Sequence, residues 1–234
     1  MNKKLSISLI IPTYNDEETI IQHVRRCEDI LNKYCDSFEI IIADDNSWDD
    51  TRDLLEKFKI KKNYTIIFNK QNLGITANVS QLYSLAQKEL ILFYSADGDW
   101  ETKDVENLIS TLLKTNADIV IGKRIKKIGY TPYRRVISFL HKFIPLILFG
   151  VNTIDPGGIK IVRKKLAHIK LVSKSQFFEA EIIIRAKRKG YRISSHPVVY
   201  KKNYYGSGRG GGLSDAIHSF IDILRLRIYL FNHN

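Results

Sequence analysis

Two carboxylates stand close together where an apolar run of the sequence ends. Residues 90–93 are apolar, and the stretch that follows, YSADGDW at 94–100, places Asp97 and Asp99 on either side of a glycine. Like charges this close repel each other unless a cation is held between them. Mg²⁺ and Mn²⁺ favour oxygen ligands, commonly one or two carboxylates together with substrate phosphates. The pair therefore predicts a divalent-cation site, and an ordinary acidic turn is the alternative.

Polar clusters follow two other apolar runs. PTYND at 12–16 follows residues 5–11, and DDNSWDD at 44–50 follows residues 38–43. Asp44, Asp45, Ser47 and Asp49 are residue types that also form turns and helix caps. Two adjacent aspartates directly after a buried strand exceed what a cap requires, so this cluster too is a candidate binding site.

The elements that position these clusters alternate along the first half of the chain. Periodicity predicts strands at residues 5–11, 38–43, 64–68, 89–94 and 117–121, with helices at 17–33, 49–59, 75–87 and 104–114. Such alternation predicts an α/β fold with a mostly parallel, Rossmann-like sheet that is covered by helices on both faces. Ligands of these sheets bind beyond the carboxyl ends of the strands. The three polar clusters are therefore expected at one edge, in one cleft.

The second half of the chain is less regular. Residues 133–151 begin basic and become apolar, with Pro145 interrupting the run, and are expected to be either core or an interfacial segment. A strand at 158–162, a helix at 178–189 and a strand at 191–200 follow. The glycine-rich stretch YYGSGRGGG at 204–212 then leads to a final amphipathic helix.

Composition and charge limit the class of protein. A chain of 234 residues, 44% of them hydrophobic, predicts one globular domain with or without a tail. Cys27 and Cys35 fit neither a disulfide framework nor a zinc motif, so we expect reduced thiols in a cytosolic protein. We find no signal-peptide pattern and no run approaching the roughly 20 apolar residues that span a bilayer.

The charge of the chain is unevenly distributed. Residues 1–118 contain 14 Lys and Arg against 20 Asp and Glu, whereas residues 119–234 contain 23 against 5. A basic half of this kind attracts polyanions, whether nucleic acid, an anionic membrane surface or a phosphorylated substrate. No nucleic-acid recognition motif is visible, so nucleic acid is not an expected partner. A merely solvated basic face is the alternative.

The clusters, in this order, resemble glycosyltransferase family 2 enzymes with a GT-A fold. The stretches that carry the resemblance are LIIPTYNDEETI, EIIIADDNSWDDT, LILFYSADGDW, ADIVIGKR, DPGGIKIVRKKL and YYGSGR. Within the family, the sequence is most similar to dolichol-phosphate mannose synthases and bacterial polyprenyl-phosphate glycosyltransferases. The resemblance implies a GT-A domain at 1–212, with a nucleotide-sugar half at 1–122 and an acceptor half at 123–212, followed by an amphipathic C-terminal helix at 213–234.

The resemblance also implies roles for individual residues. Asp97, Asp99 and Arg124 are the expected catalytic residues, with Asp97 and Asp99 as the expected ligands of Mg²⁺ or Mn²⁺. Arg135 matches a position associated with the phosphate of the acceptor. Positions that contact the nucleotide-sugar donor match Pro12, Tyr14, Asp16, Ala43, Asp45, Ser95, Ala96, Asp97, Arg124 and Arg209.

The sequence departs from the family pattern at two places. The synthases usually read Asp-Ala-Asp-x-Gln, whereas here Ser95 replaces the first acid and Asp99 replaces the glutamine. The number of carboxylates is kept, but their positions are shifted. In the glycine-rich loop, Arg209 replaces a lysine and Asn203 replaces the arginine that opens the pattern. Both departures bear on the geometry with which a metal and phosphates would be held.

The resemblance implies an inverting transfer of sugar from a nucleotide diphosphate to a polyprenyl phosphate. A phosphate nucleophile needs no strong general base, and no histidine falls within the motifs. We expect a protein on the cytoplasmic face of a membrane, docked through residues 136–151 and the final helix unless both complete the core. A hydroxyl acceptor on a glycan, protein or polymer, and a nucleotide-sugar-binding subunit without turnover, remain alternatives; the oligomeric state is left open.

Overall fold

Strands and helices alternate along most of the chain. The computed structural model describes residues 5–58, 63–128, 132–201 and 213–233. The strands in these ranges are β1 (Leu5–Thr13), β2 (Cys35–Asp44), β3 (Tyr64–Phe68), β4 (Leu90–Phe93), β5 (Ile119–Ile128), β6 (Lys160–Arg163) and β7 (Ile193–Lys201). The helices are α1 (Ile20–Tyr34), α2 (Thr51–Phe58), α3 (Ile75–Leu85), α4 (Lys103–Thr115), α5 (Pro132–Phe149), α6 (Lys164–Ala167), α7 (Phe178–Arg188) and α8 (Leu213–Asn232).

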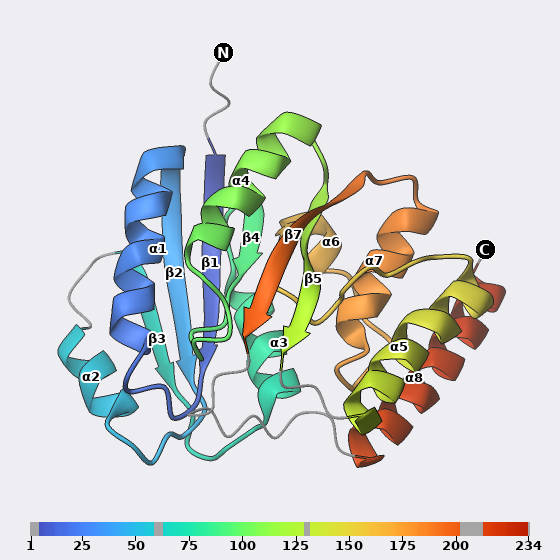
Figure 1. The fold of residues 1–234 in the computed structure, drawn as a ribbon, viewed down its shortest axis with the longest axis horizontal. Helices are drawn as coiled ribbons and strands as arrows, with labels where there is room; N and C mark the ends of the chain where they lie inside the picture. The colour runs from blue at the N-terminus through green and yellow to red at the C-terminus, as the bar shows by residue number, and fades with distance from the viewer. Residues whose placement is uncertain (1–4, 59–62, 129–131, 202–212, 234) are drawn as a thin grey trace.

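The seven strands form one sheet in the order β3-β2-β1-β4-β6-β5-β7 (Figure 1). β1 pairs in parallel with β2 and β4, and β5 pairs in parallel with β7. Among the described strands, β6 alone runs antiparallel, to both β4 and β5. The predicted α/β fold with a mostly parallel sheet is confirmed. The reversal at β6 brings the chain between residues 150 and 159 back to the carboxyl ends of β4 and β5.

Two apolar clusters cover the two faces of this sheet. Successive side chains of a strand point to opposite faces, so Ile7, Leu9 and Ile11 of β1 pack against one layer of helices and Ile10 against the other. The first layer contains α1, α2 and α4, and the second contains α3, α6 and α7 (Figure 1). β1 is buried on both faces, which explains its nearly continuous apolar sequence.

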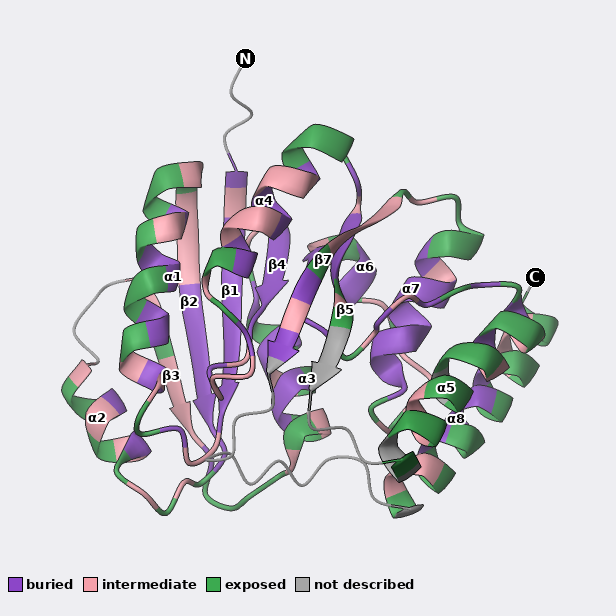
Figure 2. Ribbon diagram, in the orientation of Figure 1, coloured by how far each residue is buried: buried purple, intermediate pink, exposed green. Residues whose placement is uncertain are grey.

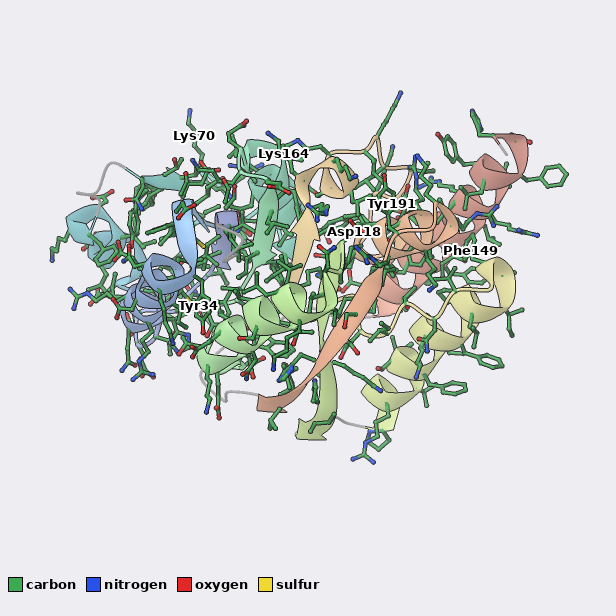
Figure 3. All side chains as sticks on the ribbon, turned by 90° about the horizontal axis from the view of Figure 1, so that it is seen from above. Tyr34, Lys70, Asp118, Phe149, Lys164 and Tyr191 are labelled. Carbon is green, nitrogen blue, oxygen red and sulfur yellow. The ribbon has the colours of Figure 1, made fainter. Side chains whose placement is uncertain are left out.

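A third, smaller cluster lies beside the sheet and joins α5, α7 and α8. Phe149 of α5 packs with Phe177 and with Ile223 and Leu226 of α8. Figure 3 shows these helices from above, with Phe149 labelled near the end of α5. The predicted C-terminal helix is therefore present, and part of it completes a core.

Most of the segment at 133–151 forms one helix, α5 (Pro132–Phe149), although Pro145 was expected to interrupt it. α5 continues through Pro145, where the missing N–H removes one backbone hydrogen bond without ending the helix. Pro132 occupies the first helical position, where a proline has no hydrogen bond to lose. Within the described ranges, no helix combines the length and hydropathy needed to cross a bilayer.

Candidate functional site

The carboxyl ends of β1, β2 and β4 meet at one edge of the sheet. In the strand register, Thr13 lies beside Asp44, and Ile10 lies beside Phe93. The polar clusters at 12–16, 44–50 and 95–100 follow these ends directly. The structure therefore brings all three to the same edge, as the alternation of strands and helices predicted.

Hydrogen bonds tie the loop after β1 to the loop after β2. The backbone N–H of Asn15 donates to Ser47 Oγ at 2.9 Å, and the N–H of Trp48 donates to Asn15 Oδ1 at 3.0 Å. The N–H of Asp16 donates to the hydroxyl of Thr51 at 2.8 Å. These bonds fix the start of each loop, so the position of Asp16 at the edge depends on the second loop as well as on its own.

Several residues of the acidic second loop have local structural roles. Asp44 accepts a 2.5 Å hydrogen bond from the Ser47 hydroxyl, and Asp49 Oδ1 accepts the N–H of Thr51 at 3.0 Å at the start of α2. This is the turn and cap interpretation that the sequence left open. Asp45 is also buried, but its hydrogen-bond partners lie in a more distant part of the chain.

Asp45 organises the loop between β3 and α3. Its carboxylate accepts hydrogen bonds from the Asn69 side chain and from the N–H groups of Leu73 and Gly74, each at 2.9 Å. Gly74 has φ of +81°, a conformation that favours glycine. The sequence could not indicate this role, because the partners of Asp45 lie 24 to 29 residues further along the chain.

The loop after β4 is folded around Asp97. The N–H of Asp99 donates to Asp97 Oδ1 at 3.0 Å, and Gly98 between them has φ of +77°. The side chain of Ser95 also hydrogen-bonds to Asp97. The Thr19 hydroxyl donates to the carbonyl of buried Ala96 at 2.5 Å, which ties this loop to the start of α1. Ser95, which replaces the first acid of the family pattern, thus hydrogen-bonds to Asp97, which occupies the position of the second acid.

Buried carboxylates gather at this site, and burial disfavours their charged form. Burial, together with the carboxylates of Asp99 and Asp16, raises the pKa of Asp97 to about 7. Burial also raises the pKa of Asp16 to about 6, although hydrogen bonds from Thr13 and Tyr14 lower it. Asp16 therefore joins Asp97 and Asp99 in one electrostatic group, which is a feature that the sequence alone did not indicate.

These pKa shifts predict a dependence of stability on pH. Below about pH 4, Asp97 is protonated in both the folded and the unfolded chain. Between about pH 4 and 7 the unfolded chain loses the proton first, so the free energy of unfolding falls as pH rises. We expect Asp97→Asn to raise the melting temperature by several degrees at pH 8 in the presence of a chelator, and to change it little at pH 4. Differential scanning calorimetry at both pH values measures this; equal shifts at the two would contradict it.

Asp97 and Asp99 suit a cation that completes its coordination with substrate oxygens. Among the described residues, no group of three or more His, Cys, Asp and Glu side chains is arranged to hold a metal ion. Mg²⁺ commonly takes only one or two carboxylates and obtains its other ligands from phosphates and water. The raised pKa of Asp97 marks a position where added positive charge would be favourable. The donor set therefore fits a divalent cation bound together with a phosphorylated ligand.

Arg124 packs against Trp100, the residue that follows the acidic loop, and also contacts Asp155 and Tyr200. Its Nε donates to Asp155 Oδ2 at 2.7 Å, and its Nη2 forms a second, shorter bond to Oδ1. The guanidinium carbon lies 5.8 Å from the ring centroid of Trp100 and 5.4 Å from that of Tyr200. The two rings pack edge to face at 5.2 Å. Because Trp100 follows Asp99 directly, the arginine and the acidic loop share this packing.

Two glycines allow the segment that contains Asp155 to approach β5. A Cβ atom on Gly122 would lie 2.7 Å from Ile159 Cγ1, and one on Gly158 would lie 2.6 Å from the carbonyl oxygen of Gly122. The same approach lets Asp155 Oδ2 accept the backbone N–H of Arg124 at 3.0 Å. A side chain at either glycine would push β5 and the segment at 155–159 apart.

Substituting these glycines should have unequal effects. Gly158→Ala places a methyl group against backbone that cannot rotate away, and we expect a loss of about 1–3 kcal/mol in the free energy of unfolding. Gly157→Ala is the matched control, because only Arg124 Nη2, at 3.9 Å, lies near the added atom. Urea denaturation compares the two variants, and equal destabilisation would contradict the close-approach argument.

The other residues expected at the site are placed as follows. Pro12 and Ala43 are buried neighbours in β1 and β2, and Tyr14 is half-buried after β1. Arg135 is exposed on the first turn of α5. Arg209, expected to contact the donor, lies outside the described residues, as does Asn203.

Sequence reasoning overlooked the aromatic part of the site. The sequence did not predict that Trp100, Tyr200 or Asp155 would contact Arg124. Tyr94 was also overlooked: its buried hydroxyl donates to the carbonyl of Trp100 and contacts His23 Nδ1, both at 3.1 Å. An aromatic residue directly after the two carboxylates was the one local signal available.

Comparisons with known proteins agree with this architecture. A sequence model described as "Glycosyl transferase family 2" matches residues 8–169. A dolichyl-phosphate beta-glucosyltransferase of Trichomonas vaginalis is 27% identical over 245 residues, covering 95% of this chain and 73% of that protein. A dodecaprenyl-phosphate galacturonate synthase of Rhizobium johnstonii is 23% identical over 232 residues, covering 97% of this chain and 68% of that protein.

The fold is also similar to solved structures. Glucosyl-3-phosphoglycerate synthase from Mycobacterium tuberculosis, in complex with Mn²⁺, UDP and glucosyl-3-phosphoglycerate, superposes with a TM-score of 0.69. The two sequences are 16% identical, and the match covers 95% of this chain and 80% of that one. At this identity the likeness establishes the fold, and the chemistry has to be argued from the residues of this chain.

Proposed function

Because the chain belongs to glycosyl transferase family 2, with a GT-A-like fold, we propose that it transfers a sugar from a nucleotide-diphosphate sugar to a polyprenyl phosphate. The observation that carries this proposal is that the guanidinium of Arg124 packs on Trp100, the residue directly after the acidic loop of Asp97 and Asp99. The acidic loop can hold a cation, and Arg124 can bind phosphate. Both are needed in a reaction that has a diphosphate leaving group and a phosphate nucleophile.

The donor is proposed to bind along the edge formed by β1, β2 and β4. Tyr14 offers an aromatic face and Asp16 a carboxylate for the base and ribose of the nucleotide. Asp45 contributes by shaping the loop at 69–74 that borders this edge. The complete set of proposed donor-binding residues is Pro12, Tyr14, Asp16, Ala43, Asp45, Ser95, Ala96, Asp97, Arg124 and Arg209.

Asp97 and Asp99 are the residues proposed to hold Mg²⁺ or Mn²⁺. When bound, the ion would neutralise the negative charge that develops on the departing nucleoside diphosphate. Ser95 and the N–H of Asp99 orient the Asp97 carboxylate for this purpose. Because the pKa of Asp97 is raised to about 7, protons and metal cations compete for its carboxylate near neutral pH.

Arg124 is proposed to bind phosphate oxygens, and Asp155 to act as its positioning residue. A guanidinium presents a planar fork of N–H donors that matches phosphate geometry. Asp155, Trp100 and Tyr200 fix that fork before a ligand arrives, which reduces the entropy lost on binding. Arg135 is proposed to bind the phosphate of the acceptor.

The proposed reaction is a single displacement at the anomeric carbon. A phosphate monoester has its second pKa near 6, so most of it is dianionic at neutral pH and can attack without a general base. A bond forms between its oxygen and the anomeric carbon while the bond to the diphosphate oxygen breaks, which inverts the configuration. The two relatives described above carry glucose and galacturonate in their names, so the sugar has to be identified by experiment.

The test is a screen of nucleotide sugars with a short polyprenyl phosphate, with and without Mn²⁺. We expect release of nucleoside diphosphate that requires both lipid phosphate and metal, and a product that mild acid hydrolyses. An acid-stable product would instead identify a hydroxyl acceptor. Donor binding without turnover on any acceptor would identify a nucleotide-sugar-binding subunit.

A further inference from the structure

Exposed apolar side chains are concentrated on two helices. Eighteen large apolar side chains of the described residues are exposed, and twelve of them belong to α5 and α8. We call these twelve the apolar plate: Val136, Phe139, Leu140, Phe143, Leu146 and Ile147 of α5, and Ile217, Phe220, Ile221, Leu224, Ile228 and Phe231 of α8. Scattered single apolar residues are normal on a protein surface, but twelve on two helices that contact each other are a candidate interaction site.

The plate is additional to the core of these helices. Each helix already buries one apolar stripe: Phe149 of α5 packs on Ile223 and Leu226 of α8, and on α7. The plate residues recur at three- and four-residue intervals on each helix, so they form a second stripe. Figure 2 shows that much of the ribbon of both helices is coloured as exposed. The α5 and α8 segments therefore complete a core and also present apolar surface outwards.

The plate follows β5, the strand that contains Arg124, along the chain. α5 starts at Pro132, four residues after β5 ends at Ile128, and four residues span at most about 14 Å. Arg124 lies on β5 at this end of the sheet. α5 thus begins eight residues after Arg124, and Figure 1 shows it beginning toward the edge where the strands end, which is the edge where the acceptor phosphate is proposed to react.

Charge beside the plate favours an anionic occupant. Residues 119–154 contain no Asp or Glu, and Arg135 and Lys142 are exposed on α5. On α8, Arg225 and Arg227 are exposed; the buried Asp222 forms a 3.0 Å ion pair with Arg225 and also accepts backbone N–H bonds from residues 174 and 175. A symmetric dimer through this face would place like charges opposite each other. A bilayer of anionic lipid would complement them.

We propose that the apolar plate is the face with which the protein lies on an anionic bilayer. Phe139 and Phe143 stack with ring centroids 5.2 Å apart, and such aromatic side chains anchor helices that lie in the plane of the interface. The inference rests on the proposed function and deepens it, because it names the surface through which the enzyme reaches a lipid-borne acceptor.

Flotation with vesicles tests the proposal. We expect the protein to float at least about tenfold more with vesicles containing about 30 mol% phosphatidylglycerol than with phosphatidylcholine alone, and less as salt rises. Phe143→Ser with Ile147→Ser, and Phe220→Ser with Ile228→Ser, should each lower binding about tenfold or more. Leu85→Ser with Leu113→Ser is the matched control, because these exposed apolar side chains lie on α3 and α4.

Activity on a short, water-soluble prenyl phosphate separates this inference from the proposed function. Plate variants should keep that activity and lose activity on acceptor embedded in vesicles. Equal flotation of plate variants and wild type, or no preference for anionic vesicles, would overturn the inference while leaving the function standing. A dimer that plate substitutions dissociate, seen by light scattering, would also overturn it. Vesicle binding without turnover on any prenyl phosphate would refute the function alone.

Discussion

Replacing Asp97 with asparagine is expected to lower kcat/KM by about 10³-fold, since removing a group that stabilises developing charge typically costs this much. Asparagine keeps an oxygen that can accept the N–H of Asp99, so the loop should keep its shape. What it loses is the negative charge needed to hold a divalent cation against the diphosphate. The same substitution that stabilises the fold at pH 8 should therefore abolish most of the activity.

Steady-state kinetics over a range of Mn²⁺ concentrations measure this effect. The apparent affinity for Mn²⁺ should fall together with the rate. Asp104→Asn is the matched control, because burial also raises the pKa of Asp104, at the start of α4, outside the proposed ligand set. If Asp97→Asn and Asp104→Asn had the same kinetics and metal dependence, Asp97 would have no role in holding a cation.

Substituting Arg124 should have the second largest effect. Arg124→Lys keeps the charge but cannot form both bonds to Asp155 or the same contact with Trp100 and Tyr200. We expect a loss of about 10²-fold in kcat/KM. Arg124→Ala should lose more, and added guanidinium ion should restore part of its activity where equal concentrations of sodium ion do not.

Asp155→Asn separates positioning from charge. The amide retains one oxygen acceptor, so Arg124 should stay near its place but become more mobile, with a loss of about tenfold. If Asp155 had a mainly structural role, Asp155→Asn would lower the melting temperature. Adding Asp155→Asn to Arg124→Ala would then leave the rescue by guanidinium ion unchanged. If Arg124→Lys had wild-type kinetics on every acceptor, the arginine would not bind phosphate in the reaction.

The edge of the sheet was predictable because its determinants are local. Apolar strands that end in polar clusters, with helices between them, require the clusters after β1, β2 and β4 to meet. Asp97 and Asp99 flank a glycine, so their proximity followed from covalent geometry. The sequence also indicated two apolar segments, now α5 and α8, as either core or interfacial. Each helix has one apolar stripe that is buried and another that is exposed, so the segments are only partly core.

Contacts between distant parts of the chain were not predictable. Arg124 meets Asp155 because β6 reverses direction between β4 and β5, and no local pattern distinguishes a parallel from an antiparallel strand of four residues. Aspartate is a residue type that often binds ligands, yet the carboxylate of Asp45 accepts hydrogen bonds from the loop at 69–74. Its burial decides between those interpretations, and burial depends on tertiary packing.

A crystal structure of the protein with Mn²⁺ and a nucleoside diphosphate would test the central claim most directly. We predict anomalous density for one Mn²⁺ between Asp97 and Asp99, with the diphosphate bound to it and within reach of Arg124. Density for the metal at another acidic cluster, such as Glu17, Asp49 and Asp50, with the nucleotide away from the carboxyl end of β4, would contradict the account.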